Sequence, residues 1–224
     1  MPQAKRRSDG GRRCTAGSIR QGLLSIALIF LLAACGEDKP DTLPSGSHVL
    51  ALGDSLTAGA GVKPEQAWPD LLASRTGWLV INGGVNGDTS AAALRRLPAL
   101  LEQHQPVLVL VTLGGNDMLR QHPQSETVAN LGEIITLVKA QGAKPVLLAT
   151  PQPSVAGALF RNLSAAGFYR KVAEAQQVPL IEDAIADVLS DPQLKGDPLH
   201  PNAAGHQLLA EKIYEALQSI GYAR

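Results

Sequence analysis

Four short stretches of the sequence carry the side-chain types that acyl transfer by a serine nucleophile requires. They are Gly53-Asp54-Ser55-Leu56, Gly87-Asp88-Thr89, Gly114-Gly115-Asn116-Asp117 and Asp197-Pro198-Leu199-His200-Pro201-Asn202. A serine needs a base to accept its proton, the base needs a carboxylate to orient it, and the oxyanion needs hydrogen-bond donors. Each of these parts has a candidate here, so the pattern indicates covalent ester chemistry.

The base and its orienting carboxylate are predicted to be His200 and Asp197. They lie three positions apart in a proline-rich turn, so the carboxylate can hold one imidazole nitrogen while the other faces a serine. The alternative is that Asp197 caps the turn and His200 is a surface residue. A metal site fits this spacing less well, because no second His or Cys lies at ligand spacing and His206 falls on the next predicted helix.

The nucleophile is predicted to be Ser55, with Gly87 and Asn116 as oxyanion donors. Ser55 follows an apolar run and a glycine, an arrangement that exposes its hydroxyl at a sharp turn. The Asn116 side-chain amide and the Gly87 N–H would join the Ser55 N–H as donors. Each motif has a structural alternative, since Ser55, Asn116-Asp117 and Gly87-Asp88-Thr89-Ser90 are all good helix caps or turns.

The predicted secondary structure brings these motifs to one edge of a sheet. Apolar runs at 48–52, 78–81, 107–113, 145–149 and 178–181 are continuous, which is typical of parallel strands buried on both faces. Helical patterns alternate with them at 66–75, 90–103, 125–141, 159–176, 184–189 and 203–218. This alternation predicts a doubly wound α/β domain, whose ligands bind beyond the carboxyl ends of the strands.

With these residues in place, the chain resembles the SGNH/GDSL hydrolase superfamily over residues 48–218. The defining serine, glycine, asparagine and histidine fall on Ser55, Gly87, Asn116 and His200 in order, and the triad aspartate falls on Asp197. The resemblance implies a three-layer α/β/α, flavodoxin-like fold with a five-stranded parallel sheet of order 2-1-3-4-5. It also implies that the reaction requires no metal or organic cofactor. The wording of the motifs is similar to the bacterial thioesterase I/lysophospholipase/arylesterase subgroup.

Two departures from that subgroup concern the site. Pro198 stands where the subgroup usually has glycine, which stiffens the turn before His200. The segment with Pro151, Gln152 and Pro153 also differs, and in the relatives it borders the acyl pocket. These three residues are therefore candidates for the substrate loop.

The first 34 residues have the order of parts of an export signal. Basic residues come first, an uncharged run covers 23–32, and Ala33 and Ala34 precede Cys35. The run is far shorter than the ~20 apolar residues of a membrane-spanning helix, and an uncleaved anchor is the alternative. Residues 32–35 resemble a bacterial lipobox, which implies a diacylglycerol on Cys35. If the host is Gram-negative, Gly36 then resembles the outer-membrane sorting pattern.

The expected domains are a signal peptide at 1–34, a lipid-anchored tether at 35–47 and a hydrolase domain at 48–224. Removing the signal reduces the 20 basic residues to 14 and the 20 acidic residues to 19, so the net charge becomes about −5. This charge disfavours nucleic acid as a partner. Removal of the signal also takes away Cys14, which leaves no disulfide partner for Cys35. We expect the protein to be membrane-anchored in the bacterial cell envelope, facing the periplasm.

The function that these features predict is that of a serine esterase. The expected substrates are aryl or short and medium acyl esters, lysophospholipids or acyl thioesters. A polysaccharide deacetylase on the same fold and a lipoprotein that binds lipid or glycan without catalysis are the alternatives. Trp68 and Trp78 are expected in the core, and His48, His104 and His122 at the surface or at strand edges. The sequence makes no prediction of oligomeric state.

Overall fold

Five parallel strands form one sheet, with the order β2-β1-β3-β4-β5. The computed structural model describes residues 42–154 and 162–224. The strands are β1 (His48–Gly53), β2 (Leu79–Gly84), β3 (Leu108–Thr112), β4 (Lys144–Leu148) and β5 (Leu180–Ile181). Both the parallel pairing and the strand order that the resemblance implied are confirmed.

The helices alternate with the strands along the chain. They are α1 (Ser55–Ala58), α2 (Trp68–Thr76), α3 (Ser90–His104), α4 (Gly115–Leu119), α5 (Gln124–Ala140), α7 (Phe168–Gln176), α8 (Ala184–Ser190) and α9 (Ala203–Ser219). Two short 3₁₀ turns, η1 (Pro64–Gln66) and η2 (Pro192–Leu194), precede α2 and α9. The predicted helix 66–75 therefore begins at Trp68, with Gln66 in the 3₁₀ turn.

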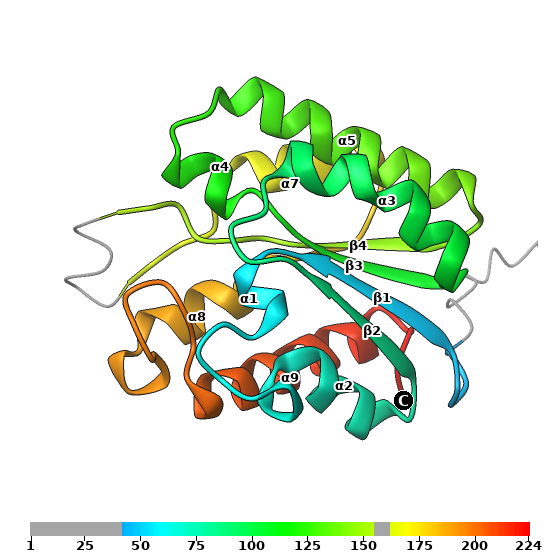
Figure 1. Ribbon diagram of the computed structural model, residues 1–224, viewed down its shortest axis with the longest axis horizontal. Helices are drawn as coiled ribbons and strands as arrows, with labels where there is room; N and C mark the ends of the chain where they lie inside the picture. The colour runs from blue at the N-terminus through cyan, green and yellow to red at the C-terminus, as the bar shows by residue number, and fades with distance from the viewer. Residues whose placement is uncertain (1–41, 155–161) are drawn as a thin grey trace, which may run out of the picture. The chain divides into compact units, whose positions relative to one another are not determined.

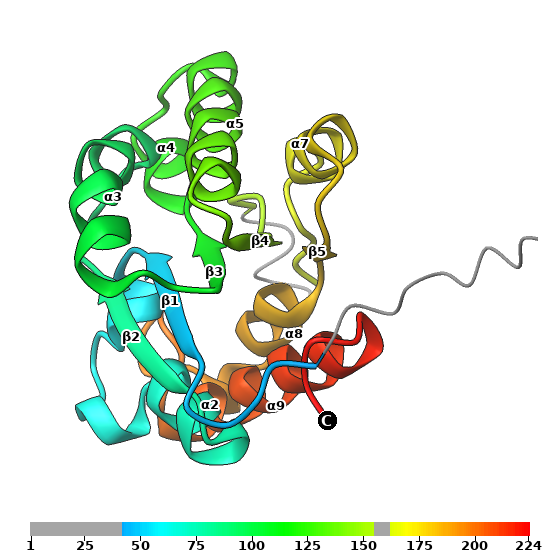
Figure 2. The same ribbon diagram turned by 90° about the vertical axis from the view of Figure 1, so that its right-hand side faces the viewer.

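Helices cover both faces of the sheet, as Figures 1 and 2 show: α3, α5 and α7 on one face, and α2, α8 and α9 on the other. Each face has its own core. Leu97, Ile134 and Tyr169 are fully buried in the first, and Trp68 and Ile213 are fully buried in the second. The strand side chains are apolar on both faces because both are covered. Trp78 is also buried, so the expectation for both tryptophans is confirmed.

The predicted helix 159–176 is wrong at its amino end. Residues 159–161 lie outside the described residues, and α7 begins only at Phe168. The preceding segment is extended: the Gln152 N–H donates to Ser164 O at 2.9 Å, and the Ala166 N–H donates to Thr150 O at 3.1 Å. These backbone groups pair with the chain after β4, so they are unavailable for helical hydrogen bonds.

The carboxyl ends of β2, β1 and β3, three neighbouring strands, lie level with one another. The register pairs Gly53 of β1 with Gly84 of β2 and with Thr112 of β3. Residues that follow these strands by two to four positions therefore emerge side by side. This alignment brings the segments that carry Ser55, Gly87 and Asn116 together.

Gly84 allows α1 to pack directly on β2. A Cβ at Gly84 would lie 2.2 Å from Ala58 N and 2.6 Å from Ala58 Cα. Because these are backbone atoms, no side-chain rotation relieves the clash. The helix that begins with Ser55 can sit at this height only if residue 84 has no side chain.

We expect Gly84→Ala to lower the free energy of unfolding by about 3 kcal/mol, because overpacking displaces α1. Urea unfolding measures the loss. Gly167→Ala is the matched control, since Gly167 has φ −62° and no atom would lie within 4 Å of its Cβ. Equal stability of the two variants would contradict the packing argument.

Residues 42–47 are held at the amino ends of the strands. The Leu43 N–H donates to Tyr222 O at 2.9 Å, the Trp78 Nε1–H donates to Leu43 O at 3.3 Å, and the Gly46 N–H donates to Gly77 O at 2.8 Å. The chain thus enters this domain at the end of the sheet opposite to Ser55. Within residues 42–154 and 162–224, no helix combines the length and hydrophobicity needed to cross a membrane.

Candidate active site

Ser55, His200 and Asp197 form a continuous hydrogen-bonded chain. His200 Nε2 lies 2.9 Å from Ser55 Oγ, and His200 Nδ1 lies 2.8 Å from Asp197 Oδ2 and 3.0 Å from Asp197 Oδ1. When Nδ1–H donates to the carboxylate, Nε2 is left as an acceptor for the serine hydroxyl. This is the tautomer that a general base requires.

The loop before α9 holds His200 in place. Asp197 Oδ1 accepts the backbone N–H groups of Leu199 at 2.7 Å and His200 at 2.9 Å. Asp197 therefore caps the turn and also holds the imidazole, so the two interpretations of this residue are compatible. The hydrogen bond from His200 is the main cause that lowers the pKa of Asp197 below its ordinary value.

Asn202 fixes the other end of this loop. Its Oδ1 accepts the Gly205 N–H at 3.0 Å as the cap of α9, and its Nδ2 donates to Gln193 O at 2.8 Å. The Asn202 N–H donates to Leu194 O at 2.8 Å. His200 is therefore held two residues before the cap of α9.

Ser55 is the first residue of α1, and Asp54 is its cap. Asp54 Oδ1 accepts the Leu56 N–H at 3.0 Å. The structural alternative for Ser55, a helix cap, is therefore wrong, because its neighbour has that role. The Ser55 side chain is left to contact His200.

Gly87 and Asn116 lie beside Ser55 in the same pocket. Gly87 has φ +76°, a conformation that favours glycine, and its carbonyl accepts a hydrogen bond from Arg120 Nη2 at 2.7 Å. Asn116 lies in the first turn of α4, and its Nδ2 donates to Asp54 Oδ2 at 3.1 Å and to Asp88 O at 3.0 Å.

The helix-cap alternative is confirmed for one of the other two motifs and wrong for the other. Thr89 does cap α3, because its Oγ1 accepts the Ala92 N–H at 3.3 Å. Asn116 and Asp117 do not cap α4, which begins after Gly114. Asp117 instead accepts the Ser90 N–H at 2.9 Å and the Ser90 hydroxyl at 2.6 Å, joining α4 to the start of α3.

The pocket at these residues has a volume of about 700 Å³ and a mainly apolar wall. Five segments supply the apolar part of that wall: α1, α4, the chain between β4 and α7, α8 and the loop before α9. Its apolar residues include Leu56, Leu119, Pro151, Pro153, Leu163, Leu189, Pro198 and Leu199. Gln152 also lines it, so all three substrate-loop candidates lie on the wall, and Pro198 faces the same space.

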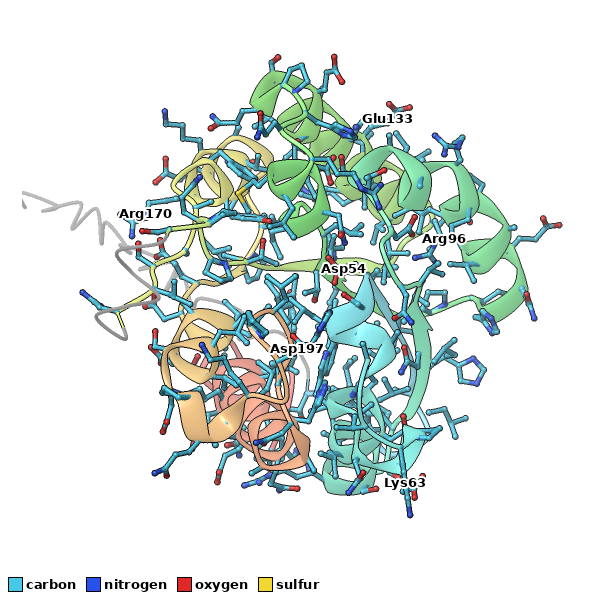
Figure 3. The ribbon with its side chains drawn as sticks, turned by 60° about the vertical axis from the view of Figure 1, so that its left-hand side comes forward. Asp54, Lys63, Arg96, Glu133, Arg170 and Asp197 are labelled. Carbon is cyan, nitrogen blue, oxygen red and sulfur yellow. The ribbon has the colours of Figure 1, made fainter. Side chains whose placement is uncertain are left out.

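Three residues near the site had no role in the sequence prediction: Asp54, Asp88 and Arg96. Arg96 Nε donates to Asp88 Oδ2 at 2.8 Å, and its Nη2 donates to Gly53 O at 3.0 Å. Figure 3 shows Asp54 between Arg96 and Asp197, whereas Lys63, Glu133 and Arg170 lie at the margins of that view. Asp54 stands within a recognised motif, but no sequence pattern marks Arg96.

Two buried side chains near the site have strongly shifted pKa values. Burial raises the pKa of Asp54 from 3.8 to about 6, although the hydrogen bond from Leu56 N–H opposes the shift. Burial lowers the pKa of His206 from 6.5 to about 4. The His206 ring is inaccessible to solvent, and its Nδ1 accepts the Trp68 N–H at 3.3 Å.

We expect these two shifts to oppose each other as the pH changes. The raised pKa of Asp54 gives stability that is present below pH 3.8 and is lost as the pH rises through about 6. The lowered pKa of His206 gives stability that is present above pH 6.5 and is lost as the pH falls through about 4. Each contribution is on the order of 3 kcal/mol. The wild-type free energy of unfolding should therefore change little across this range.

Urea unfolding at pH 6.5 and pH 4 of two variants separates the contributions. Asp54→Asn should become less stable as the pH falls, and His206→Gln should become more stable, each by on the order of 3 kcal/mol. If the free energy of unfolding changes in the same direction with pH in both variants, the two side chains do not compensate each other.

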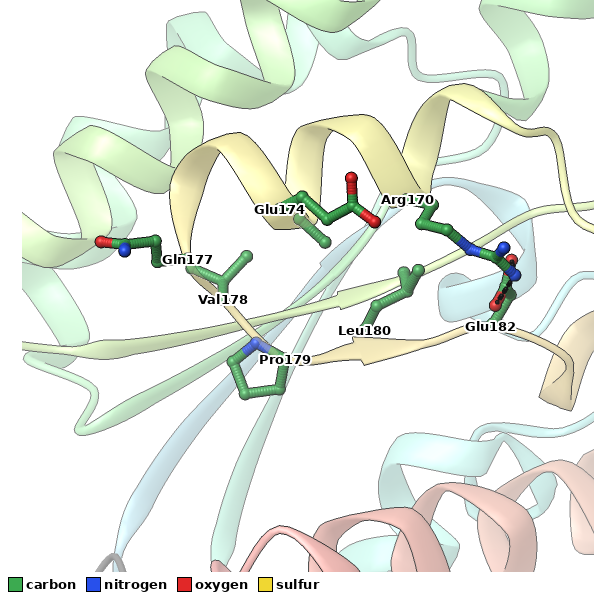
Figure 4. A pocket seen from close by; sticks show the side chains of 8 residues that line it. Arg170, Glu174, Gln177, Val178, Pro179, Leu180 and Glu182 are labelled. Carbon is green, nitrogen blue, oxygen red and sulfur yellow. Dashed lines mark hydrogen bonds and ion pairs between the residues drawn. The ribbon is translucent and has the colours of Figure 1, made fainter. Parts of the chain in front are cut away.

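A second hollow, of about 580 Å³, lies between α7 and the edge strand β5 (Figure 4). At one end, Arg170 Nη2 donates to both carboxylate oxygens of Glu182 at 2.8 Å. None of the described residues that line this hollow is Ser, Cys or His. Its described lining therefore offers no serine or cysteine nucleophile, and the pocket at Ser55 remains the candidate active site.

The part of the chain that the structure describes holds no group of three His, Cys, Asp or Glu side chains able to bind a metal ion. The candidate catalytic side chains are those of Ser55, His200 and Asp197. Those side chains match a known family, whose model, described as the GDSL-like Lipase/Acylhydrolase family, matches residues 51–208. The chain belongs to this family.

The relatives of this chain are described as enzymes that hydrolyse esters or thioesters. The thioesterase 1/protease 1/lysophospholipase L1 of Escherichia coli (strain K12) is 40% identical over 203 residues, covering 88% of this chain and 91% of that protein. An arylesterase of Vibrio mimicus is 36% identical over 201 residues, covering 87% and 96%. The esterase EstA of Pseudoalteromonas sp., in a crystal structure inhibited by monoethylphosphonate, has a TM-score of 0.67 and 29% identity, covering 77% and 97%.

Proposed function

We propose that this family member is a serine esterase that hydrolyses carboxylic esters or thioesters through an acyl-Ser55 intermediate. The observation that carries the proposal is the 2.9 Å contact from Ser55 Oγ to His200 Nε2, with Asp197 on the other imidazole nitrogen. This contact provides the nucleophile with a base in the required tautomer.

In the first half-reaction, Ser55 Oγ attacks the acyl carbon while His200 Nε2 accepts the hydroxyl proton. The carbonyl oxygen becomes an oxyanion beside the N–H groups of Ser55 and Gly87 and the Asn116 amide. No acceptor is found for either N–H group among the described residues, so both are available to the oxyanion. His200 then donates its proton to the leaving alcohol or thiol.

In the second half-reaction, water attacks the acyl-serine and His200 accepts a proton from it. Collapse of the second tetrahedral intermediate releases the carboxylic acid, and His200 returns the proton to Ser55 Oγ. Asp197 stabilises the imidazolium in both half-reactions and keeps Nδ1 protonated. Metal ions and organic cofactors take no part in these steps.

The proposed substrates carry an apolar acyl or aryl group and a small or amphiphilic leaving group. The wall of the 700 Å³ pocket favours such groups by burying their surface. The descriptions of the relatives, arylesterase and thioesterase/lysophospholipase, support aryl esters, lysophospholipids and acyl thioesters as candidates.

The proposed location is the bacterial cell envelope, with a lipid on Cys35. This part of the proposal depends on the sequence alone, because residues 1–41 lie outside the described residues. The chain enters the domain at the amino ends of the strands, whereas Ser55 lies beyond their carboxyl ends. Mass spectrometry of the amino-terminal peptide tests for the lipid.

Labelling with a fluorophosphonate tests the proposed activity. The probe should modify Ser55 in the wild type and in Ser74→Ala, a control for an exposed serine of α2, but not in Ser55→Ala. A panel that varies acyl length and leaving group, with a lysophospholipid and an acetylated sugar, then ranks the substrates. If the wild type is not labelled under conditions that label a known serine esterase, the proposed mechanism is wrong.

A further inference from the structure

We propose that Asp54, Asp88 and Arg96 form a closed hydrogen-bonded circuit that positions the Asn116 amide relative to Ser55. This inference rests on the proposed function, in which Asn116 donates to the oxyanion. It assigns Asp54 and Arg96 as positioning residues. Arg96 is not among the residues that line the pocket, and Asp54, which does line it, is almost completely buried.

The circuit begins at the Asn116 amide, which has two N–H groups and two partners. Nδ2 lies 3.1 Å from Asp54 Oδ2 and 3.0 Å from Asp88 O. With both partners in place, rotation of the amide about its side chain would break a hydrogen bond. The direction of Nδ2 is therefore set by two neighbours that come from two other motifs, and the oxyanion of the proposed reaction has to share one of these N–H groups with the neighbour that already accepts it.

Asp54 connects this amide to the nucleophile. One of its oxygens accepts from Asn116, and the other accepts the Leu56 N–H at 3.0 Å at the start of α1. The side chain is only 2% exposed, so water does not compete for these oxygens. Ser55 and Asn116 lie far apart in the sequence, but one buried carboxylate holds the segments of both.

Arg96 closes the circuit from α3. It holds the Asp88 carboxylate through Nε at 2.8 Å and the Gly53 carbonyl through Nη2 at 3.0 Å. Gly53 directly precedes Asp54, and the Asp88 carbonyl holds Asn116. The guanidinium thus fixes both partners of the Asn116 amide at once, a task that suits its planar, forked set of donors.

The circuit matters because an oxyanion donor acts only when it is aimed correctly. Removing one such donor costs about 10²- to 10³-fold in kcat in other serine hydrolases, and a productive site tolerates misplacement of only about 0.5 Å. Loosening the circuit should therefore weaken binding of the transition state more than binding of the substrate.

Arg96→Gln tests the circuit, with Arg95→Gln as the matched control. Arg95 is the exposed neighbour on α3, and the change in charge is the same. We expect Arg96→Gln to lower kcat for an aryl ester by about 10-fold with KM unchanged. The Ki of an aryl boronic acid, which forms a tetrahedral adduct with the serine, should rise by the same factor. Arg95→Gln should match the wild type in all three quantities.

Two more variants keep the test decisive if Arg96→Gln does not fold correctly. Arg96→Lys retains the charge beside Asp88 but lacks the fork, so kcat should fall between those of the wild type and Arg96→Gln. The asparagine of Asp54→Asn has a single side-chain oxygen in place of two, so it cannot replace both hydrogen bonds that Asp54 accepts, from the Leu56 N–H and from the Asn116 amide. This variant should lower kcat by up to about 100-fold. Titration of active sites with the fluorophosphonate corrects each kcat for inactive protein.

A readout independent of catalysis separates this proposal from the proposed function. The Asn116 side-chain amide hydrogens, observed by NMR, should exchange slowly with water in the wild type and in Arg95→Gln. In Arg96→Gln they should exchange at least about 10-fold faster, because an open circuit exposes them. Fast exchange in the wild type, or unchanged exchange and kcat in Arg96→Gln, would overturn the circuit. An unlabelled and inactive wild type with slow Asn116 exchange would overturn the esterase proposal instead.

Discussion

Replacing Ser55 with alanine should lower kcat for an aryl ester by at least about 10⁴-fold. The variant loses the oxygen that forms the acyl-enzyme, and His200 Nε2 loses the partner that lies 2.9 Å away. The change is small and Ser55 does not cap α1, so the free energy of unfolding should change by less than about 1 kcal/mol. Initial rates with a chromogenic ester, together with urea unfolding, measure both quantities.

Ser74→Ala is the control for this variant, because Ser74 lies on α2 and its hydroxyl contacts only its own helix. It should retain the wild-type rate. Lost turnover with retained binding of a non-hydrolysable ester analogue in Ser55→Ala supports the enzyme. Binding without turnover in both the variant and the wild type would support the alternative of a lipid- or glycan-binding protein.

Asp197→Asn should have the second largest effect, lowering kcat by about 10³- to 10⁴-fold. The asparagine oxygen can still accept the Leu199 and His200 N–H groups, so the loop should keep its shape. Its amide would donate to Nδ1 of His200, which places the imidazole proton on Nε2. In that tautomer His200 cannot accept the proton of Ser55.

Asp191→Asn is the matched control in the same part of the chain. Asp191 is exposed and its Oδ1 accepts the Gln193 N–H at 2.8 Å, so it has the turn role of Asp197 without the contact to histidine. The control should keep the wild-type kcat. A fall of less than about 10-fold in Asp197→Asn would show that the carboxylate does not set the tautomer.

The strands and the motif positions could be predicted because their signals are local. Buried parallel strands are continuous apolar runs, and all five were found at or near their observed positions. The observed β5 is only Leu180–Ile181, shorter than the predicted run, although the Pro179 carbonyl still accepts the Leu147 N–H of β4 at 3.0 Å. The error before α7 has a different cause, since the chain there pairs with the segment after β4.

The supporting residues of the site could not be predicted in this way. Arg96 contacts Gly53, which is 43 positions away, and His206 contacts Trp68, which is 138 positions away. Such partners are chosen by the packing of α3 and α9 against the sheet. A charged residue on a helix is usually a solvated one, so its sequence context gave no reason to select Arg96.

The sequence by itself determined the residue types of the site, their order along the chain and the strand ends at which they stand. These properties are local or follow from the alternation of strands and helices. Only the tertiary structure decided that His200 meets Ser55, that Asp54 caps α1 and shares the Asn116 amide, and that Arg96 joins two motifs. The physical reason is that hydrogen bonds between distant segments depend on the register of the sheet and on helix packing, which arise only when the whole domain is folded.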